Sequence, residues 1–547
     1  MNNQSWKIIN NEVVGFQFYE KTAIDKHVCL AIMKKHGDKM NLLNCQQRLA
    51  LAESGRKYSR GMMSRKEFIN ICLKAGLGFS GLSFLGACGS DKQKDQTKIQ
   101  KVEDVLSKNS AGITNSDQQK FLKEWGKSFK GKTLSIVTEN TPPSKFTRQL
   151  AKKEFEQLTG IHIEWELLPL DKVLSLLLTD TVMKSGRNDI YYWDQAWVGR
   201  FVNDAVNPME LMQKKDLAYP GFDFDDFLQP LVENIASYGG NVVGLPYDIP
   251  VFILMYRKDI FEELKLNVPT TLDEFMTTAK AITEAKAPQV YGTIGQWKSG
   301  HYALECDMTA WLWAHGGSIF GKNNIPAIND ERAYAAMEYM MALKKYMPPG
   351  VTGWDWSGQI DNMAKGRAGM YISWGEGFPT YDDPRYSKVV GLMEPAPCPK
   401  EIALRTKSEC SFDETPGMSH QGGSCLAISK YSRNIEAAWI FLQWATSADI
   451  TTRAGALGGA SSPVRKSNYT DPRVLAKKKV GPGTTRHFDV TLDAILNRMG
   501  TEPHLPMWAS LSVDSFAVEL GKMTTGQQSI KNTLDNMAKD ALKASKQ

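Results

Sequence analysis

Between residues 132 and 194 the sequence alternates between strand-like and helix-like patterns, and no other stretch restricts the fold as much. Strand candidates cover residues 132–138, 161–167 and 189–193, and helix patterns fill the two intervals. Gly160 follows the first helix pattern, and glycine is the residue that most often ends a helix. This order of strands and helices predicts a parallel, doubly wound α/β sheet.

Polar residues follow two of these strands. Glu139 and Asn140 come after the first strand, and Asp194 and Gln195 come after the third. Ligands of such sheets bind beyond the carboxyl ends of the strands, so these residues are candidate ligand contacts. Asp194 could instead cap the short helix that follows it. Trp197 could either stack on a ligand or fill the core.

Later segments continue the α/β pattern. Val251–Arg257 is a strong strand candidate, and Thr271 and Glu274 form a capping-box pattern at the start of a helix. Further elements are expected within residues 361–374, 422–428 and 513–546. At about 100–200 residues per domain, the chain after residue 88 is long enough for two lobes.

An export signal is predicted upstream of these elements. Basic residues precede an apolar core from Ala75 to Ala87, which is 13 residues long and leads into Cys88. Such a core is too short to cross about 30 Å of hydrocarbon as a stable helix. A basic flank, a short apolar core and small residues before the end are typical of an export signal, here residues 62–87. The alternative is a buried amphipathic helix that ends in a structural cysteine.

The residues on either side of this signal are expected to lie outside the folded lobes. Residues 1–61 are interpreted as a non-native leader from a start codon placed too early, with Met62 or Met63 as the true start. A genuine cytoplasmic leader is the alternative. Residues 88–130 are rich in polar side chains and are expected to form a linker.

Composition excludes several classes of protein. A net charge of +6 over 547 residues is too dilute for a nucleic-acid-binding surface. A hydrophobic content of 42% excludes a wholly disordered chain. The 14 Trp and 18 Tyr residues favour a ligand such as a sugar, because aromatic faces that are not used in the core can stack on sugar rings.

Four cysteines follow Cys88, namely Cys306, Cys398, Cys410 and Cys425. Outside the cytoplasm Cys398 and Cys410 could close a short loop as a disulfide, and buried thiols are the alternative. Together with His420 they lack the closely spaced cysteine pairs of structural zinc sites. No metal site is therefore expected.

Two short motifs resemble known bacterial export signals. Leu85-Gly86-Ala87-Cys88 resembles a lipobox, in which the cysteine is acylated and becomes the first mature residue. Cys88 is therefore the predicted lipidation site. Residues 64–69 resemble a twin-arginine signal with Lys66 in place of the second arginine, which leaves the export route open. These motifs imply a lipoprotein outside the cytoplasm, in the periplasm or at the cell surface.

The downstream segments, taken in order, resemble family 1 of the bacterial extracellular solute-binding proteins, most closely its carbohydrate-binding branch. The segments that carry the resemblance are Gly244–Phe261, Val268–Phe275, Lys365–Met370, Ser429–Trp439 and Gly458–Arg465. The similarity spans roughly residues 131–545. It implies a two-lobed, type II periplasmic-binding-protein-like fold, with a doubly wound sheet in each lobe and a ligand cleft between them.

The resemblance also implies where the lobes divide and how the protein works. Lobe 1 would comprise residues 131–250 and 418–447, and lobe 2 residues 251–417 and 448–547. Such a protein binds a sugar, an oligosaccharide or a polyol without turnover or cofactor. It acts as a monomer, anchored to the membrane by its lipid, and delivers its ligand to an ABC permease with a cytoplasmic ATPase.

Further candidate contacts come from positions that match the family. Tyr247 and Asp248 lie at the first crossing between lobes, where a hinge turn without ligand contact is the alternative. Trp374 and Glu376 occupy the position where related proteins carry a stacking aromatic. Trp297 follows a strand and is a weaker stacking candidate. Gly423 and its neighbour Gly422 would let the backbone approach a ligand closely, although a plain turn explains them as well. Arg465 completes the predicted set, with a structural ion pair as the favoured alternative.

Two other functions remain open at the level of sequence. An exported glycoside hydrolase would need paired carboxylates, for which Asp194, Glu376 and Glu139 are candidates. The element order does not give the eight repeats of a βα barrel. A binder of a non-sugar solute, such as a polyamine, would need carboxylates that converge between aromatic walls.

Overall fold

The chain divides into two compact units, Met1–Ser107 and Lys108–Gln547. The computed structural model describes residues 116–402, 409–410, 414–457 and 463–546 of the second unit. In the first unit it describes the strands β1 (Ile8–Ile9) and β2 (Glu12–Val13), which pair antiparallel. The predicted export signal and lipidation site at Cys88 lie outside the described residues.

Lobe 1 is built around a five-stranded sheet with the order β4-β3-β5-β13-β8. Its strands are β3 (Thr133–Glu139), β4 (His162–Leu168), β5 (Ile190–Asp194), β8 (Leu245–Asp248) and β13 (Ser424–Ile428). Strand β3 pairs parallel with β4 and β5, as the alternating pattern predicts. Strand β13 arrives from far along the chain and lies antiparallel between β5 and β8.

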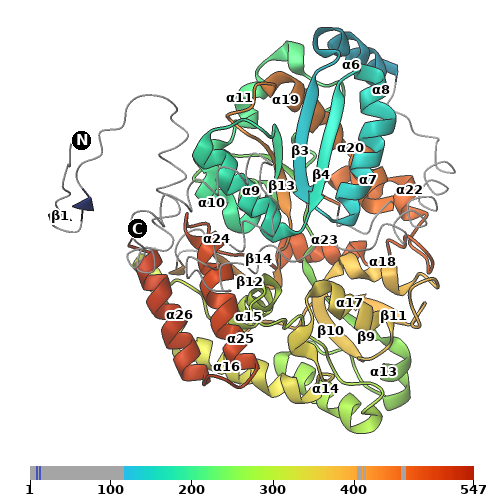
Figure 1. The fold of residues 1–547 in the computed structure, drawn as a ribbon. Coiled ribbons are helices and arrows are strands. Elements are labelled where there is room, and N and C mark those ends of the chain that lie inside the picture. The colour runs from blue at the N-terminus through green and yellow to red at the C-terminus, as the bar shows by residue number, and fades with distance from the viewer. Residues whose placement is uncertain are drawn as a thin grey trace, which may run out of the picture. The chain divides into compact units, whose positions relative to one another are not determined.

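The helices of lobe 1 flank this sheet (Figure 1). Helix α7 (Pro142–Leu150) continues through a π-helical turn over Ala151–Phe155 into α8 (Glu156–Thr159). Gly160 ends α8 at φ 70°, in the left-handed region that glycine adopts without strain. Helix α9 (Leu170–Met183) leads into β5.

The end of the expected linker is helical. Residues 116–129 form α6 (Ser116–Phe129), whose Leu122 and Gly126 are buried against α8. A Cβ at Gly126 would lie 2.3 Å from the Thr159 carbonyl oxygen, so only glycine permits this approach. The polar composition concealed a helix with a narrow apolar stripe, and the predicted boundary at residue 130 is corrected on this point.

Lobe 2 is built around a three-stranded antiparallel sheet with the order β10-β9-β11. Its strands are β9 (Phe252–Arg257), β10 (Met370–Trp374) and β11 (Met393–Ala396). Its main helices are α13 (Lys258–Leu264), α14 (Leu272–Lys286), α15 (Tyr302–Ala314), α16 (Glu331–Leu343), α17 (Trp356–Ala364), α25 (Ala517–Thr524) and α26 (Ile530–Ala544). Both hydrogen bonds of the predicted capping box form at Thr271 and Glu274.

A separate two-stranded pairing lies where the chain returns toward lobe 1. Strand β12 (Thr415–His420) pairs antiparallel with β14 (Met499–Thr501). Gln421, which follows β12, bridges to Val251 just before β9. The segments that precede β9 and β13 therefore run side by side between the two sheets.

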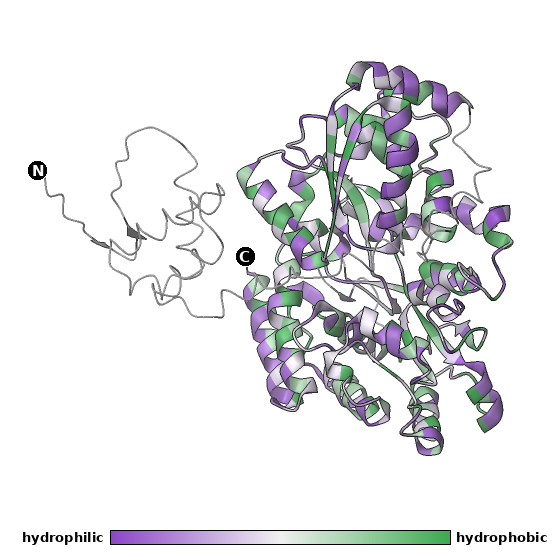
Figure 2. Ribbon diagram, turned by 45° about the vertical axis from the view of Figure 1, so that its right-hand side comes forward, coloured by the Kyte–Doolittle hydropathy of each residue, from purple (hydrophilic) through white to green (hydrophobic). Residues whose placement is uncertain are grey.

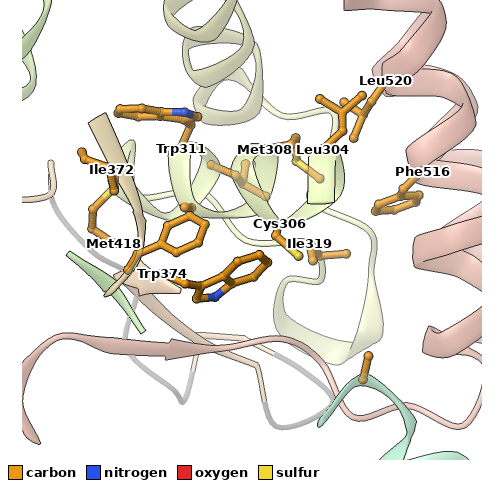
Figure 3. Packing of buried hydrophobic residues seen from close by; sticks show 14 of the residues in the cluster. Leu304, Cys306, Met308, Trp311, Ile319, Ile372, Trp374, Met418, Phe516 and Leu520 are labelled. Carbon is orange, nitrogen blue, oxygen red and sulfur yellow. The ribbon is translucent and has the colours of Figure 1, made fainter. Parts of the chain in front are cut away.

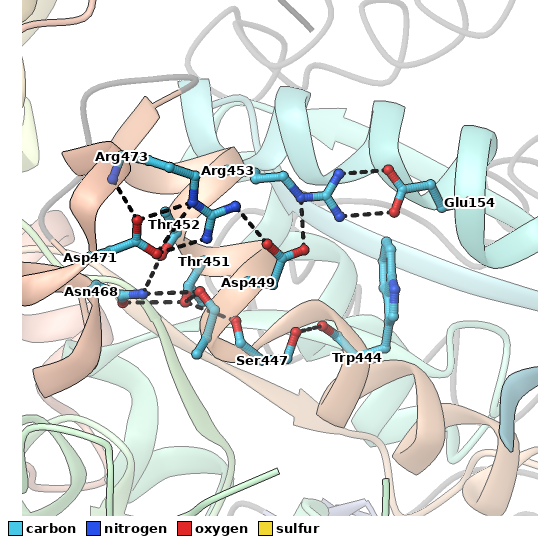
Figure 4. A network of polar contacts seen from close by, with 11 residues as sticks. Glu154, Trp444, Ser447, Asp449, Thr451, Thr452, Arg453, Asn468, Asp471 and Arg473 are labelled. Carbon is cyan, nitrogen blue, oxygen red and sulfur yellow. Dashed lines mark hydrogen bonds and ion pairs between the residues drawn. The ribbon is translucent and has the colours of Figure 1, made fainter. Parts of the chain in front are cut away.

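The segment after residue 448, which we expected in lobe 2, packs on lobe 1 instead. It forms α20 (Ala448–Ile450), a π-helical turn, α21 (Lys466–Thr470) and α22 (Pro472–Leu475). Arg453 donates two hydrogen bonds of 2.6 and 2.8 Å to Glu154, and Asp449 accepts from Arg453 and Arg473 at 2.8 Å each (Figure 4). The remaining lobe boundaries stay predictions.

The core follows the hydropathy of the sequence. Strands and inward helix faces are hydrophobic, and outer helix faces are hydrophilic (Figure 2). Helix α19 (Ile435–Ala445) is buried over almost its whole length. In lobe 2, Trp374 packs in one cluster with Ile372 of the same strand, with Met418 of β12 and with Cys306 of α15 (Figure 3).

None of the helices in the described part of the chain combines the length and the apolar character that a bilayer crossing requires.

Candidate ligand pocket between the two sheets

A pocket lies where the ends of both sheets face each other, and we call it the interlobe pocket. Its lining comprises Glu139, Thr141, Leu170, Tyr192, Asp194, Asp248, Pro250, Tyr302, Trp356, Trp374, Glu376, Gly422 and Gly423. The space between the atoms amounts to about 450 Å³, open solvent at the mouth included.

Strand ends supply the acids of lobe 1. Glu139 ends β3, Asp194 ends β5 and Asp248 ends β8. The register places Asp194 and Asp248 opposite the same residue, Ser424 of β13. Because β13 joins β5 to β8 at this point, both carboxylates reach the same edge of the sheet. This is the edge at which doubly wound sheets bind ligands.

Lobe 2 supplies most of the aromatic wall. Trp374 ends β10 opposite Phe252 of β9, and their rings meet edge to face with centroids 5.2 Å apart. Trp356, the first residue of α17, packs edge to face on Trp374 at 6.1 Å. Trp374 is 7% exposed, and its indole nitrogen has no hydrogen-bond partner. Tyr302 begins α15.

Two glycines let the backbone approach these side chains. A Cβ at Gly422 would lie 2.7 Å from Nε1 of Trp374. Gly423 has φ +86°, and a Cβ there would lie 1.7 Å from the carbonyl oxygen of Asp248. Only glycine combines this left-handed conformation with so close an approach. The glycine pair therefore shapes the pocket floor.

Burial suppresses the charge of the pocket acids. It raises the pKa of Asp194 to about 8, against the opposing hydrogen bond of 2.9 Å from the Ala196 backbone N–H. Burial likewise raises the pKa of Asp248 to about 6. The pKa of Glu376 rises to about 8 through burial and the nearby Asp248. Glu139 has a pKa well above its usual range because of burial and repulsion by the other three acids.

Residues 138–452, more than half of the chain, match the family described as bacterial extracellular solute-binding protein. The chain belongs to this family. Its extracytoplasmic location follows from this membership.

Three similar proteins share about a quarter of their aligned residues with this chain. A probable amino-acid ABC transporter periplasmic-binding protein of Sinorhizobium fredii is 24% identical over 59% of this chain and 70% of its own length. A mannitol-binding protein of Pseudomonas aeruginosa is 24% identical over 58% of this chain and 69% of its own. An ABC transporter solute-binding protein of Agrobacterium radiobacter, solved in complex with ribitol, is 26% identical, with TM-score 0.67, over 76% of this chain and 99% of that chain.

The interlobe pocket of this solute-binding protein gathers about half of the residues predicted from sequence. These are Glu139, Asp194, Asp248, Trp374, Glu376, Gly422 and Gly423. Asp194 also accepts the hydrogen bond that caps the following turn, so both interpretations of this residue apply. Ligand contact itself stays a prediction for all of them.

Several predicted residues lie away from the pocket lining. Asn140 is exposed, and its backbone N–H donates to the Leu168 carbonyl. Trp197 and Trp297 are core residues, and the Trp297 indole donates to Asp307 at 3.1 Å. Both tryptophans therefore pack in the core and do not line the pocket.

Tyr247 and Arg465 are also held by the protein itself. The Tyr247 hydroxyl donates to Thr147 at 2.9 Å, beside rather than within the pocket. Arg465 is 1% exposed, donates to the Thr446 carbonyl at 2.7 Å and lies 3.8 Å over the Phe227 ring. Arg465 therefore contributes to the packing of lobe 1.

Sequence reasoning missed six lining residues, namely Thr141, Leu170, Tyr192, Pro250, Tyr302 and Trp356. Tyr192 lies inside a predicted strand, two residues before Asp194. Because side chains two residues apart point to the same face of a strand, the sequence could have predicted that Tyr192 lies on the side of Asp194. Tyr302 and Trp356 begin helices of lobe 2. No local pattern marks them, because tertiary packing alone brings them to the pocket.

A buried hydrogen-bond network lies behind the pocket and joins the lobes. Glu502 accepts from Gln195 of lobe 1, from His420 and from Trp508, each at 2.7 Å, and from the lining residue Tyr302 at 3.2 Å. The pKa of Glu502 is lowered overall. Burial alone would raise it, but the interactions with His420, Trp508 and Gln195 favour the ionised carboxylate more strongly. Gln195, predicted as a ligand contact, is thus a link between lobes.

Cys306 completes a cluster with His420 and Glu502, whose ligating atoms lie within 4.8 Å of one another. The oxygens of Glu502 already accept the hydrogen bonds described above. Burial and the nearby carboxylates raise the pKa of Cys306 well above its usual range, which keeps the thiol protonated. Because metals require the thiolate, these groups fit a hydrogen-bonded network better than a metal site.

The disulfide between Cys398 and Cys410 is not formed, and that prediction is wrong for this structure. Cys398 is buried, and its thiol lies 3.5 Å from the carbonyl oxygen of Phe252 in β9. Cys410 instead lies in a backbone bridge to Gly321. The two cysteines are close in sequence, but the fold places them against different segments of the chain.

Proposed function

We propose that this solute-binding protein is the substrate-binding component of an ABC importer and captures a sugar, an oligosaccharide or a polyol in the interlobe pocket. One observation carries the proposal: strand ends of two sheets bring carboxyl groups and aromatic rings to face one pocket. Carboxyl oxygens bind hydroxyl groups directionally, and aromatic rings cover the apolar face of a carbon chain or ring. Burial strengthens such hydrogen bonds by lowering the local dielectric.

The action is binding without chemistry, and it ends in delivery to permease subunits. Ligand contact by Glu139, Asp194, Asp248, Trp374, Glu376 and Gly423 forms part of the proposal. A ligand favours the conformation that it binds better, so ligand binding would close the lobes. The permease could then distinguish the closed, liganded form from the open one. The network around Glu502 supports this step, since Gln195 and Tyr302 reach it from different lobes.

A thermal-shift screen against mono-, di- and oligosaccharides and polyols tests the function. A ligand at about 100 times its dissociation constant adds about 2.7 kcal/mol to the free energy of unfolding, a readily measured change. Oligosaccharides should be recovered intact after incubation. Cleaved products would contradict the binding role in favour of a hydrolase.

Lipid attachment at Cys88 is the second part of the proposal. Cys88→Ser should abolish acylation and release the protein from the membrane fraction, because stable anchoring requires more than one acyl chain and these would all be lost. Membrane fractionation with a mass measurement checks this. A Cys88→Ser protein that stays in the membrane at unchanged processed mass would exclude the anchor.

A further inference from the structure

The interlobe pocket contains acids but no basic side chain. Its lining includes the carboxyl groups of Glu139, Asp194, Asp248 and Glu376. None of the described residues in the lining is Lys, Arg or His. Elsewhere in the described chain, buried or half-buried acids such as Glu154 and Asp382 have an arginine partner. The pocket acids therefore lack the kind of counter-charge that Glu154 and Asp382 have.

Two buried polar atoms in the lining also lack partners. Asp248 is 1% exposed, and its Oδ1 accepts no hydrogen bond. The Nε1 of Trp374 donates none. Buried polar groups are nearly always satisfied, and in a pocket a ligand or an ordered water can supply the missing partner. A ligand for both atoms needs a donor for the carboxylate and an acceptor for the indole.

The spacing of the acids argues against a bare metal ion. Among the described residues, the acids of the interlobe pocket do not bring three ligating atoms within 4.8 Å of one another; the cluster that does so is Cys306, His420 and Glu502. The walls between the acids are aromatic, with Tyr192, Tyr302, Trp356 and Trp374. Aromatic faces attract organic cations and also cover their carbon chains.

We propose that the natural ligand is a hydroxylated amine, a sugar or polyol in which a protonated nitrogen replaces at least one hydroxyl group. The inference rests on the proposed function and refines its ligand class. The ammonium group would lie among the four carboxylates, with Asp248 Oδ1 as one acceptor, and a ligand hydroxyl would accept from Trp374. The carbon chain would lie against the aromatic wall.

Protonation gives this inference a distinctive signature. In the free protein, burial favours the neutral acids. A cation favours their ionised form, so its binding releases protons and becomes tighter as pH rises, whereas a neutral polyol leaves the acids protonated. Other titratable groups near the acids are Tyr192 and Tyr302 in the lining, and His301, Glu305, Cys306, His420 and Glu502 behind it. Tyr247 also lies near Asp248, and Tyr371 and Tyr381 lie near Glu376.

The test is titration calorimetry on the full chain with matched pairs of probes. We use ribitol against 1-amino-1-deoxyribitol and glucose against glucosamine, with putrescine as a cation without hydroxyl groups. The aminodeoxy polyol should bind at least about tenfold more tightly than ribitol, as a charge-assisted hydrogen bond implies. Buffers of different ionisation enthalpy should reveal proton release for the amine alone. Its affinity should rise between pH 6 and 8, where an alkyl amine stays protonated.

Isosteric variants locate the effect. Asp248→Asn keeps the shape but removes the charge, and should weaken amine binding about tenfold to a hundredfold, clearly more than it weakens the binding of a neutral polyol. Glu376→Gln provides the same test if Asp248→Asn fails to fold. Asp307→Asn is the matched control, because Asp307 is a buried carboxylate that bonds Trp297 outside this pocket. It should leave both affinities unchanged.

The outcomes separate the inference from the function on which it rests. Equal or tighter binding of the neutral member of each pair would overturn the inference and leave the proposed function intact. Binding of putrescine without any sugar or polyol would support the cationic site and overturn the carbohydrate function. If no probe of either kind binds, the inference is overturned, and the wider screen with di- and oligosaccharides decides the proposed function.

Discussion

At the residue scale, Trp374 belongs both to the pocket lining and to the core of lobe 2. It lines the interlobe pocket, yet it is 7% exposed and packs on Phe252 and Trp356. Trp374→Ala should therefore lower the free energy of unfolding by about 3–5 kcal/mol and also weaken ligand binding. Chemical denaturation and calorimetric titration of the same variant measure both effects. Unchanged stability would mean that the ring contributes nothing to the core.

Gly423 gives a second residue-scale prediction. Gly423→Ala should cost more than the 1–2 kcal/mol of a left-handed residue, since its Cβ would lie 1.7 Å from the Asp248 carbonyl oxygen. Gly526→Ala is the matched control, because Gly526 has φ +80° with no atom within 4 Å of the added Cβ. Denaturation curves of the two variants separate steric conflict from backbone strain. Equal losses would show that the backbone relieves the contact.

At the element scale, the ion pair between Arg453 and Glu154 holds the segment after residue 448 on lobe 1. Both side chains are less than one-fifth exposed. Glu154→Gln should lower the free energy of unfolding by about 1–3 kcal/mol, because it leaves Arg453 with one carboxylate partner, Asp449. Glu124→Gln, in an exposed pair with Lys127, is the control and should change stability by less than about 1 kcal/mol. Urea denaturation compares the two.

Elements with strong local signals were predictable, and those that depend on distant packing were not. The strands β3, β4 and β5, the end of α8 at Gly160 and the capping box at Thr271 follow from periodicity and turn chemistry. Helix α6 was missed, because its polar residues outnumber a narrow apolar stripe. Pocket acids at strand ends could be predicted, whereas Tyr302 and Trp356 could not, since only the meeting of two lobes places them there.

At the scale of the whole molecule, the buried acids make stability depend on pH. Folding raises the pKa of Asp194 and Glu376 to about 8, of Asp307 to about 7 and of Asp248 to about 6, chiefly through burial. Each acid with a raised pKa stabilises the fold fully below its unfolded pKa of about 4, and this contribution is lost as pH rises through the folded pKa. One pKa unit corresponds to about 1.4 kcal/mol, so even a one-unit shift at two acids is worth about 3 kcal/mol.

The unliganded protein should therefore become less stable, by about 3 kcal/mol or more, between pH 5 and pH 8. Urea denaturation at fixed ionic strength measures this change, and Asp307→Asn should reduce it by removing one of the acids outside the pocket. A saturating aminodeoxy polyol should oppose the loss, because a bound cation favours the ionised carboxylates that the empty pocket disfavours. Stability that stays constant or rises over this range would contradict the neutral state of the pocket acids.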